Sequence, residues 1–454
     1  MNIHLIAIGG SAMHNLAIAM HQKGYIVTGS DDEIVEPSRT RLQGLGLLPA
    51  QDGWFPEKIH PALDAVILGM HARADNPELA RAKELGIPVY SYPGYIFEQS
   101  RNKTRIVIGG SHGKTSITAM ILHVMHQCGK DCDYLVGAQL KGFNTMVRLT
   151  DAPVILLEGD EYLSSALEPI PKFHLYHPHI ALLSGVAWDH INVFPTFDNY
   201  LEQFRIFIDK IASGGSLIYY EGDEHLVNLA KNAPSGIELL PYKEHPAKIE
   251  NGRTFLIKPD GTTVQIRVFG KHNLQNINGA LHVCVASGIS EAEFYEHIQS
   301  FTGAARRLEV IFEKDDFTLF KDFAHSPSKL KATTEAVREQ FPGRKLIACM
   351  ELHTFSSLNE QFLEEYQGAM NMADEAFVYF NPHTVEHKKL KPISKEQVSA
   401  AFGRSDLRVF NHSGLMLDAL KQQSWNNANL LMMSSGNFDG IQIEDLPQLL
   451  HLTQ

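Results

Sequence analysis

The chain has 454 residues, with 40 Lys and Arg against 52 Asp and Glu, which gives a formal net charge of −12. A hydrophobic fraction of 44% and a charged fraction of 20% are typical of a globular protein and exclude disorder as the dominant state. The acidic balance argues against a nucleic-acid partner, because such binding relies on clustered Lys and Arg. At about 150 residues a domain, this length predicts roughly two to four domains.

Cysteine usage and the N-terminal segment predict the compartment. The four cysteines (Cys128, Cys132, Cys284 and Cys349) are too sparse for a disulfide framework, which favours a reducing cytoplasm. Residues 1–10 lack the basic region of a signal peptide, and no apolar run approaches the roughly 20 residues of a membrane span. We therefore expect a cytoplasmic protein without a membrane partner, while the oligomeric state stays open.

Strand and helix patterns alternate along the N-terminal part of the chain. Apolar periodicity predicts helical segments around residues 16–20 and 77–85. Short apolar runs predict strands at residues 3–8, 25–28, 65–68 and 89–91. Such alternation indicates a parallel sheet covered by helices. A polar stretch at residues 99–104 predicts the end of this first domain.

The same alternation continues to the C-terminus. A helix is expected from about residue 273 to 284, after a β-rich stretch between residues 237 and 269. Further strands are predicted at residues 105–108, 154–157, 180–183, 216–219, 317–320, 345–350, 375–380 and 429–433. The predicted fold class is therefore α/β, with three consecutive domains of mainly parallel sheet at residues 1–101, 102–304 and 305–454.

The strongest local signal is residues 110–116 (G-S-H-G-K-T-S), between a predicted strand and a predicted helix. A phosphate-binding loop needs glycines so that backbone N–H groups can approach the phosphates, a lysine for the β/γ oxygens and a hydroxyl for Mg²⁺. Lys114 and Thr115 occupy the last two positions. The alternative is a glycine-rich turn with an incidental lysine, which the strand and helix context disfavours.

Polar residues follow two more predicted strands of the central region. Residues 158–161 (E-G-D-E) end one strand, and Asp189 and His190 come soon after another. Carboxylates at a strand end beside a phosphate loop are suited to a Mg²⁺ site. Each group alone could be an ordinary surface turn, but we expect them to converge on one edge of the sheet.

Seven motifs in chain order resemble those of the Mur ligase superfamily, the ATP-dependent amide-forming enzymes of peptidoglycan synthesis. In the first half of the chain these are residues 110–116 (family pattern G-T-H-G-K-T-T), 158–161 (E-A-D-E) and 189–192 (D-H-x-D). In the second half they are residues 270–276 (G-x-H-N-x-x-N), 306–309 (R-R-x-E), 322–327 (D-[YF]-[GA]-H-H-P) and 434–441 (S-x-G-x-F-x-G-I). Together they span almost the whole chain.

The resemblance implies a role for each domain and a set of site residues. A Rossmann-like N-terminal domain would bind a UDP-sugar, a central P-loop domain would bind ATP and Mg²⁺, and a Rossmann-like C-terminal domain would bind an amino acid or peptide. The implied catalytic residues are Lys114, Glu158, His190 and Arg306. The implied metal ligands are Thr115, Glu158 and His190. The implied nucleotide-binding residues are Gly110, His112, Gly113, Lys114, Thr115, Ser116, His272, Asn273, Asn276, Arg306 and Asp322. The implied substrate-binding residues are Gly10, Ser11, Ala12, Met13, Ser30, Asp31, His71, Glu161 and His325.

The resemblance also implies a reaction and a branch of the family. In such ligases a substrate carboxylate takes the γ-phosphoryl group of ATP, and an amine then displaces the phosphate. Residues 8–13 (I-G-G-S-A-M) and 29–31 (G-S-D) resemble the branch that accepts UDP-N-acetylmuramate. Tyr162, residues 322–325 (D-F-A-H) and residues 36–38 (E-P-S) resemble the enzymes that add the tripeptide L-Ala-γ-D-Glu-meso-diaminopimelate. The alternative is addition of L-alanine.

Three positions depart from the family patterns. Asn192 replaces an aspartate, Lys321 an acidic residue and Ser326 a histidine, which puts the substrate contacts in doubt more than ATP binding. The residues disfavour two other classes of protein. A non-catalytic nucleotide-binding protein would not need residues 322–325, and a dinucleotide fold fails because Ser11 and His14 stand where its glycines belong.

Overall fold

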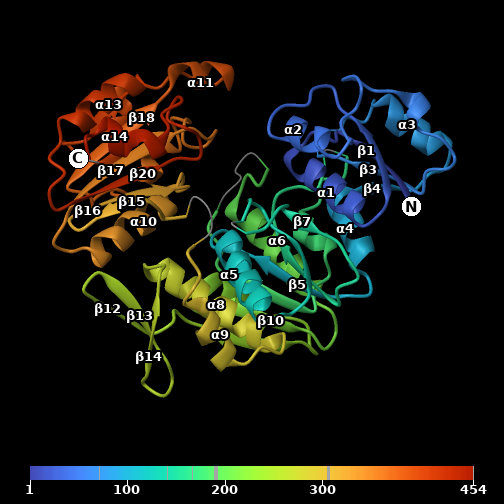
Figure 1. Cartoon of the computed structure of the whole chain (residues 1–454), viewed down its shortest axis with the longest axis horizontal. Coiled ribbons are helices and arrows are strands. Elements are labelled where there is room, and N and C mark those ends of the chain that lie inside the picture. Colours follow the sequence, from blue (N-terminus) through green and yellow to red (C-terminus); the bar gives the residue numbers. More distant parts are fainter. Residues whose placement is uncertain (71, 141, 166, 189–192, 304–306, 453–454) are drawn as a thin grey trace. The chain divides into compact units, whose positions relative to one another are not determined.

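The computed structural model describes residues 1–70, 72–140, 142–165, 167–188, 193–303 and 307–452. They form two compact units, Met1–Lys243 with Gln275–Ile298, and Glu244–Leu274 with Gln299–Gln454. Strands alternate with helices along the chain (Figure 1), so the predicted α/β class with mainly parallel sheets is confirmed. The boundaries at residues 101/102 and 304/305 stay predictions.

The first unit begins with a four-stranded parallel sheet in the order β2-β1-β3-β4. Its strands are β1 (Asn2–Ile6), β2 (Ile26–Ser30), β3 (Ala65–Leu68) and β4 (Val89–Ser91). Its helices are α1 (Ser11–Gln22), α2 (Ser38–Gln43), α3 (Pro77–Glu84) and α4 (Tyr92–Ser100). Because β1 and β2 are parallel neighbours, the turn at Gly9 and Gly10 and the carboxylate of Asp31 lie at the same edge of the sheet.

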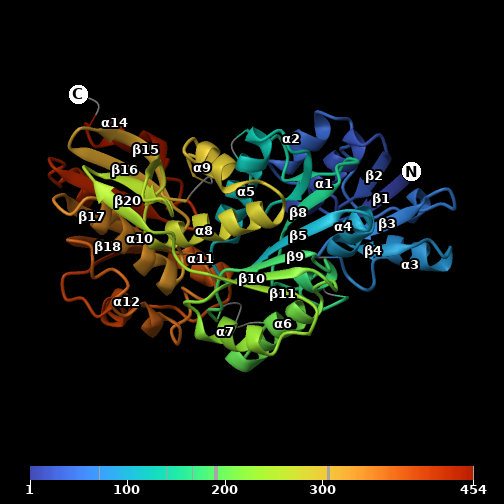
Figure 2. The same ribbon diagram turned by 90° about the horizontal axis from the view of Figure 1, so that it is seen from below.

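A second, seven-stranded sheet in this unit has the order β11-β10-β9-β5-β8-β6-β7. Its strands are β5 (Thr104–Gly109), β6 (Cys132–Leu135), β7 (Val147–Arg148), β8 (Val154–Glu158), β9 (Ile180–Leu183), β10 (Ser216–Tyr220) and β11 (Glu238–Tyr242). Its helices include α5 (Lys114–Gln127), α6 (Phe197–Asp209), α7 (Glu224–Lys231) and α9 (Glu291–Ile298). Figure 2 shows α5 and α9 on one face of the sheet and α6 and α7 on the other. Since β5 lies between β8 and β9, the carboxyl ends of these strands adjoin.

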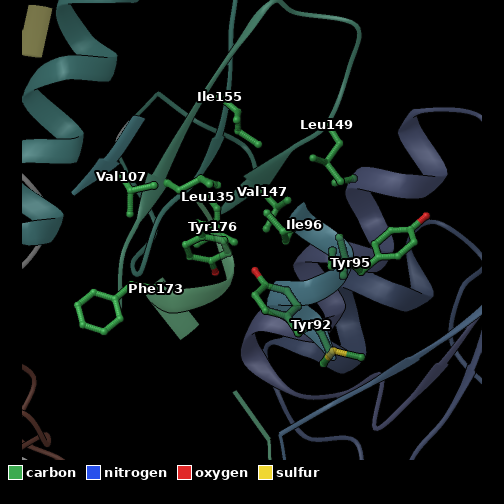
Figure 3. Packing of buried hydrophobic residues seen from close by; sticks show 14 of the residues in the cluster. Tyr92, Tyr95, Ile96, Val107, Leu135, Val147, Leu149, Ile155, Phe173 and Tyr176 are labelled. Carbon is green, nitrogen blue, oxygen red and sulfur yellow. The ribbon is translucent and has the colours of Figure 1, made fainter. Parts of the chain in front are cut away.

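One hydrophobic core runs through both sheets of this unit. Tyr92 and Ile96 on α4 face Tyr176 and Val147, as Figure 3 shows, and all four side chains are buried. Pro93 lies in the first turn of α4, where a missing N–H costs no hydrogen bond. The two sheets are therefore packed together rather than joined only by a linker.

The second unit holds a small antiparallel sheet and a larger, mostly parallel one. The small sheet consists of β12 (Ala247–Glu250), β13 (Arg253–Ile257) and β14 (Thr263–Ile266). The larger sheet has the order β15-β16-β20-β17-β18-β19, with β15 antiparallel to β16. Its strands are β15 (Glu309–Lys314), β16 (Phe317–Asp322), β17 (Lys345–Leu352), β18 (Glu375–Phe380), β19 (Arg408–Phe410) and β20 (Ala428–Met433). The helices are α10 (Pro327–Gln340), α11 (Pro382–His387), α12 (Lys395–Phe402), α13 (Ser413–Lys421) and α14 (Leu446–Leu449). Helix α8 (Lys271–Ala286) contributes residues to both units.

The predicted strands and helices occur, with differences at their ends. The strand predicted to reach residue 8 ends at Ile6, because the chain enters a turn where Ala7 takes a positive φ of 66°. The predicted helix at residues 16–20 begins already at Ser11. Among the described residues, no helix is long and apolar enough to cross a bilayer.

Candidate active site

The loop between β5 and α5 has the backbone geometry of a phosphate cradle. Gly110 and Gly113 adopt positive φ values of 124° and 77°. A Cβ atom on Gly113 would collide with the side-chain oxygen of Asn276, so glycine alone fits this position. Helix α5 begins at Lys114, directly after the loop, and the free N–H groups at its start favour an anion there.

Lys114 lies folded over this loop. Its Nζ donates to the carbonyl of Gly110 at 2.7 Å and pairs with Glu161 at 2.6 Å. Burial opposes the charge, but the neighbouring carboxylates, chiefly Glu161 and Asp160, outweigh it and raise the pKa of Lys114. The lysine is therefore a charged donor beside the cradle, as a phosphate-binding loop requires.

Thr115 and Glu158, the predicted metal ligands, bring two oxygen-bearing side chains together from neighbouring elements. The Thr115 hydroxyl donates to Oε1 of Glu158 at 2.8 Å, and the Gly137 N–H donates to Oε2 at 2.7 Å. Burial raises the pKa of Glu158. The described residues contain no cluster of three or more carboxylates, histidines or cysteines suited to a metal. A site of one hydroxyl and one carboxylate still fits Mg²⁺, which takes its other ligands from phosphates and water.

Asp160 faces a different cation. Its carboxylate pairs with Lys172 at 2.6 Å. Burial opposes its charge, but Lys172 and Lys114 prevail and lower the pKa of Asp160 to about 2. The residues at the end of β8 are thus divided: Glu158 with Thr115, Glu161 with Lys114, and Asp160 with Lys172.

A buried tyrosine that the sequence analysis missed joins the loop to Glu161. The Tyr200 hydroxyl donates to Oε1 of Glu161 at 3.2 Å and lies 2.9 Å from the Ser111 hydroxyl. Tyr200 belongs to α6 and is 89 residues from Ser111. The available signal in the sequence is its position on the apolar face of α6, which predicts burial but not a role in the site. We assign it to holding the carboxylate that faces Lys114.

Helix α8 carries three of the predicted nucleotide-binding residues, His272, Asn273 and Asn276. Asn276 lies against Gly113 of the phosphate loop, and both residues are in the first unit. Asn273 belongs to the second unit, where its amide donates to the carbonyl of Phe269 at 2.8 Å. Burial lowers the pKa of His272 to about 4, with a further contribution from Arg307, so His272 is neutral at pH 7.

The N-terminal sheet holds the predicted substrate-binding turn. The Gly9 N–H donates to Asp31 at 2.7 Å, while Ser11, Ala12 and Met13 form the first turn of α1. Burial raises the pKa of Asp31 to about 6, against the lowering effect of that backbone bond. A cavity of about 390 Å³ beside it is lined by Ala7, Asp31, Asp32, Trp54, Arg73, Asp75, Asn76 and Pro77. Met13 and Ser30 do not line this cavity. Both are buried, and the Ser30 hydroxyl accepts a hydrogen bond from Lys58 at 3.1 Å.

In the second unit Asp322 ends β16 as a buried carboxylate. It accepts bonds from the N–H groups of Leu308 at 2.6 Å and Ala324 at 2.7 Å. Burial raises the pKa of Asp322, although Arg307 opposes this. His325 follows, with Nδ1 2.8 Å from the carbonyl of Phe323. The pair Asp322 and His325 thus lies at the carboxyl edge of the large sheet.

Two of the three departures from the family patterns lie in this part of the structure. Lys321 pairs with Glu444 at 2.6 Å, so its charge is balanced within the unit. The hydroxyl of Ser326 is buried, and no partner occurs among the described residues. The third departure, Asn192, and the predicted residues His71, Asp189, His190 and Arg306 lie outside the described residues. Their roles stay predictions, as do those of His112 and Ser116.

These features define a class of protein: a P-loop enzyme that acts with a nucleoside triphosphate and magnesium. Three family models match the chain: the Mur ligase family catalytic domain at residues 2–104, the Mur ligase middle domain at 108–284 and the glutamate ligase domain of Mur ligases at 306–436. The chain belongs to the Mur ligase family. It is accordingly an ATP-dependent ligase that forms a C–N bond and uses ATP and Mg²⁺, which confirms the predicted enzyme class and cofactors.

Individual relatives cover most of the chain. A UDP-N-acetylmuramate–L-alanine ligase of Persephonella marina is 30% identical over 80% of this chain and 79% of its own. A UDP-N-acetylmuramate–L-alanyl-γ-D-glutamyl-meso-2,6-diaminoheptandioate ligase of Haemophilus influenzae is 27% identical over 99% of both chains. The crystal structure of a murein peptide ligase from Psychrobacter arcticus has a TM-score of 0.64 at 22% identity and covers 100% of this chain and 98% of that one. This last likeness concerns the fold.

Proposed function

We propose that this protein is a murein peptide ligase of peptidoglycan recycling. It joins the lactyl carboxylate of UDP-N-acetylmuramate to the free amine of L-Ala-γ-D-Glu-meso-diaminopimelate. The observation that carries this proposal is the residue pattern of the peptide-adding branch on a chain that aligns end to end with the Haemophilus influenzae peptide ligase. Tyr162 and Phe323, at positions typical of the peptide-adding branch, support it. The four free cysteines suit a reaction in the reducing cytoplasm.

The residues of the first unit support the activation step. ATP supplies the phosphoryl group that turns the carboxylate into an acyl phosphate. Both reactants are anions, so the main task of the protein is to offset negative charge. Lys114 holds phosphate oxygens, while Thr115 and Glu158 hold Mg²⁺, as their 2.8 Å contact allows. The bonds from Tyr200 and Lys114 keep Glu161 oriented.

A second candidate is ligation of L-alanine to UDP-N-acetylmuramate. The Persephonella marina relative, which bears that activity in its name, is 30% identical to this chain. Both candidates use the same phosphate loop and the same UDP-sugar, so they differ only in the acceptor amine. The acceptor must therefore be tested directly.

The deciding experiment is phosphate release with Mg-ATP and UDP-N-acetylmuramate, with L-alanine or the tripeptide added in parallel. Release that depends on the tripeptide is the expected result. Release with L-alanine alone would assign the protein to the alanine-adding step. Absence of release with both, from a protein that still binds ATP, would contradict both candidates.

A further inference from the structure

An exposed basic surface lies at the carboxyl edge of the large sheet in the second unit. It consists of Phe355, in the loop after β17, and of Lys388, Lys389 and Lys391, which follow α11; we call it the lysine patch. Phe355 is 59% exposed, which is unusual for a side chain of this size. The Nζ of Lys388 lies 4.4 Å from the centre of its ring. This cation–π contact joins the loop after β17 to the segment after β18.

The positive charge of the patch is not neutralised within the unit. Among the described residues, no carboxylate lies within ion-pair distance of Lys388, Lys389 or Lys391. Glu386, the acid on the neighbouring helix α11, is 3.9 Å from His383 instead. The Lys388 ammonium lies over an exposed aromatic ring, and Lys389 and Lys391 follow within three residues of the chain. This combination favours an anionic ligand with some apolar surface.

A series of polar contacts connects Asp322 to the loop that carries Phe355. The backbone N–H of Ser434, after β20, donates to the carbonyl of Asp322 at 3.0 Å. The Ser434 hydroxyl in turn donates to Glu351, near the end of β17, whose carboxylate lies 3.6 Å from His353. Phe355 is two residues further along the same loop. The loop that carries Phe355 is therefore fixed to the end of β16 through buried polar residues.

We propose that the lysine patch binds the distal carboxylates of the acceptor peptide and so selects a peptide over free L-alanine. This inference rests on the proposed function and adds residues to it. The patch combines cations that have no carboxylate partner among the described residues with the exposed ring of Phe355. The tripeptide carries carboxylates on its D-glutamyl and diaminopimelyl residues, whereas L-alanine carries a single one beside its amine.

The sheet order supplies the length argument. From β16, which ends at Asp322, to β18, which leads to the patch, the order β16-β20-β17-β18 gives three strand spacings, about 14 Å in all. One amino acid spans at most about 3.6 Å, so L-alanine with its amine near His325, the predicted substrate-binding residue after β16, cannot extend across three strand spacings. A tripeptide spans about 11 Å, and its γ-linkage and long diaminopimelyl side chain extend it further. Acceptor length therefore decides whether the patch is used.

The test compares acceptors on the full-length enzyme and on a Lys388→Ala/Lys389→Ala variant. We expect the KM for the tripeptide to rise about tenfold, the effect of losing two exposed charge pairs. The KM for L-Ala-γ-D-Glu should change less, and for a tripeptide amidated at both diaminopimelyl carboxylates it should not change. Lys421→Ala is the control for loss of an exposed lysine elsewhere, because this residue ends α13 at the opposite edge of the sheet, where it pairs with Asp418 at 3.2 Å.

The outcomes separate this inference from the proposed function. If the unsubstituted enzyme ligates the tripeptide and the double variant keeps its KM, the patch has no role in binding and the proposed function stands. An equal rise in KM for the amidated and the unmodified tripeptide would also overturn the inference, because it would show a loss of structure. If the unsubstituted enzyme ligates L-alanine alone, the proposed function is wrong and the role of the patch fails with it.

Discussion

Lys114 shows how one residue serves both charge balance and chemistry. Its ammonium group is the partner of Glu161, a carboxylate only 1% exposed. We expect Lys114→Ala to abolish ATP-dependent ligation, because the phosphate loop loses its cation. We also expect the free energy of unfolding to fall by about 3 kcal/mol, because the buried carboxylate of Glu161 loses the opposite charge of Lys114. Phosphate release and urea denaturation measure the two effects.

A second substitution separates these effects. Lys114→Ala/Glu161→Gln removes the buried charge as well, so this variant should regain most of the lost stability while ligation stays absent. Equal instability of the single and double variants would show that packing, rather than charge, limits this site. Full activity in a folded Lys114→Ala protein would contradict the assignment of the loop.

Asp31 gives a pH dependence with a defined sign. Its pKa in the folded protein is raised to about 6 by burial, above the 3.8 that is usual for an exposed aspartate. The folded state therefore binds more protons than the unfolded state between pH 6 and pH 4, and stability rises as the pH falls through this window. Relative to an Asp31→Asn variant, the free energy of unfolding of the unsubstituted protein should rise by on the order of 1 kcal/mol as the pH falls from 7 to 4.5. Denaturation curves at pH 7 and pH 4.5 test this, and a difference that does not change with pH would contradict it.

At the scale of elements, helix α5 is bounded by two glycines in similar conformations but different surroundings. Gly113 precedes the helix with φ 77° and lies against Asn276, whereas Gly129 follows it with φ 66° and nothing within 4 Å of an added Cβ. Gly129→Ala should cost only the backbone strain, about 1 kcal/mol. Gly113→Ala adds a steric conflict inside the phosphate loop, so ATP turnover should fall by about 100-fold or more.

These two variants form a matched pair, measured by ATP turnover and by thermal unfolding. Similar turnover in both would show that Asn276 moves away at little cost and that the loop tolerates a side chain. Lower stability of Gly129→Ala than of Gly113→Ala would contradict the steric argument in the same way.

Sequence reasoning predicted the elements whose signal is local. The strand β9 at Ile180–Leu183 is a short run of consecutive apolar residues, and it occurs as predicted. Strand β6 (Cys132–Leu135) was missed, because Asp133 interrupts its pattern; in the structure that buried carboxylate pairs with Lys103 at 2.8 Å. Helix α4 was missed because Pro93 and Gly94 usually mark turns. In β6, Lys103 is brought to Asp133 by the tertiary fold and offsets the charge that makes this segment a poor strand by its local pattern.

In the candidate site, too, the sequence predicted the residues that lie in local motifs and missed those that the tertiary fold brings in. Lys114, Thr115 and Glu158 were identified because each lies in a motif next to a strand end, and the structure brings the latter two into contact. Tyr200 and Lys172 have no motif, and they join the site only because α6 and the segment after β8 pack beside the loop. Charge compensation around Glu161 and Asp160 is therefore a property of the folded unit rather than of any short segment.

At the scale of the whole molecule, the chain forms two compact units. A ligand that binds one unit should therefore stabilise that unit against unfolding before it affects the other. We expect the UDP-sugar at Asp31 and the turn at Gly9, which lie on the four-stranded sheet of the first unit. UDP-N-acetylmuramate at 100 times its Kd should stabilise this sheet by about 2.7 kcal/mol. Because a protein of two units need not unfold in one step, hydrogen exchange of β1 and β2 is a better readout than a single melting temperature. UDP-N-acetylglucosamine, which lacks the lactyl carboxylate, is the matched control and should protect less. Protection confined to the six-stranded sheet of the second unit would place the sugar nucleotide elsewhere and contradict the role of Asp31.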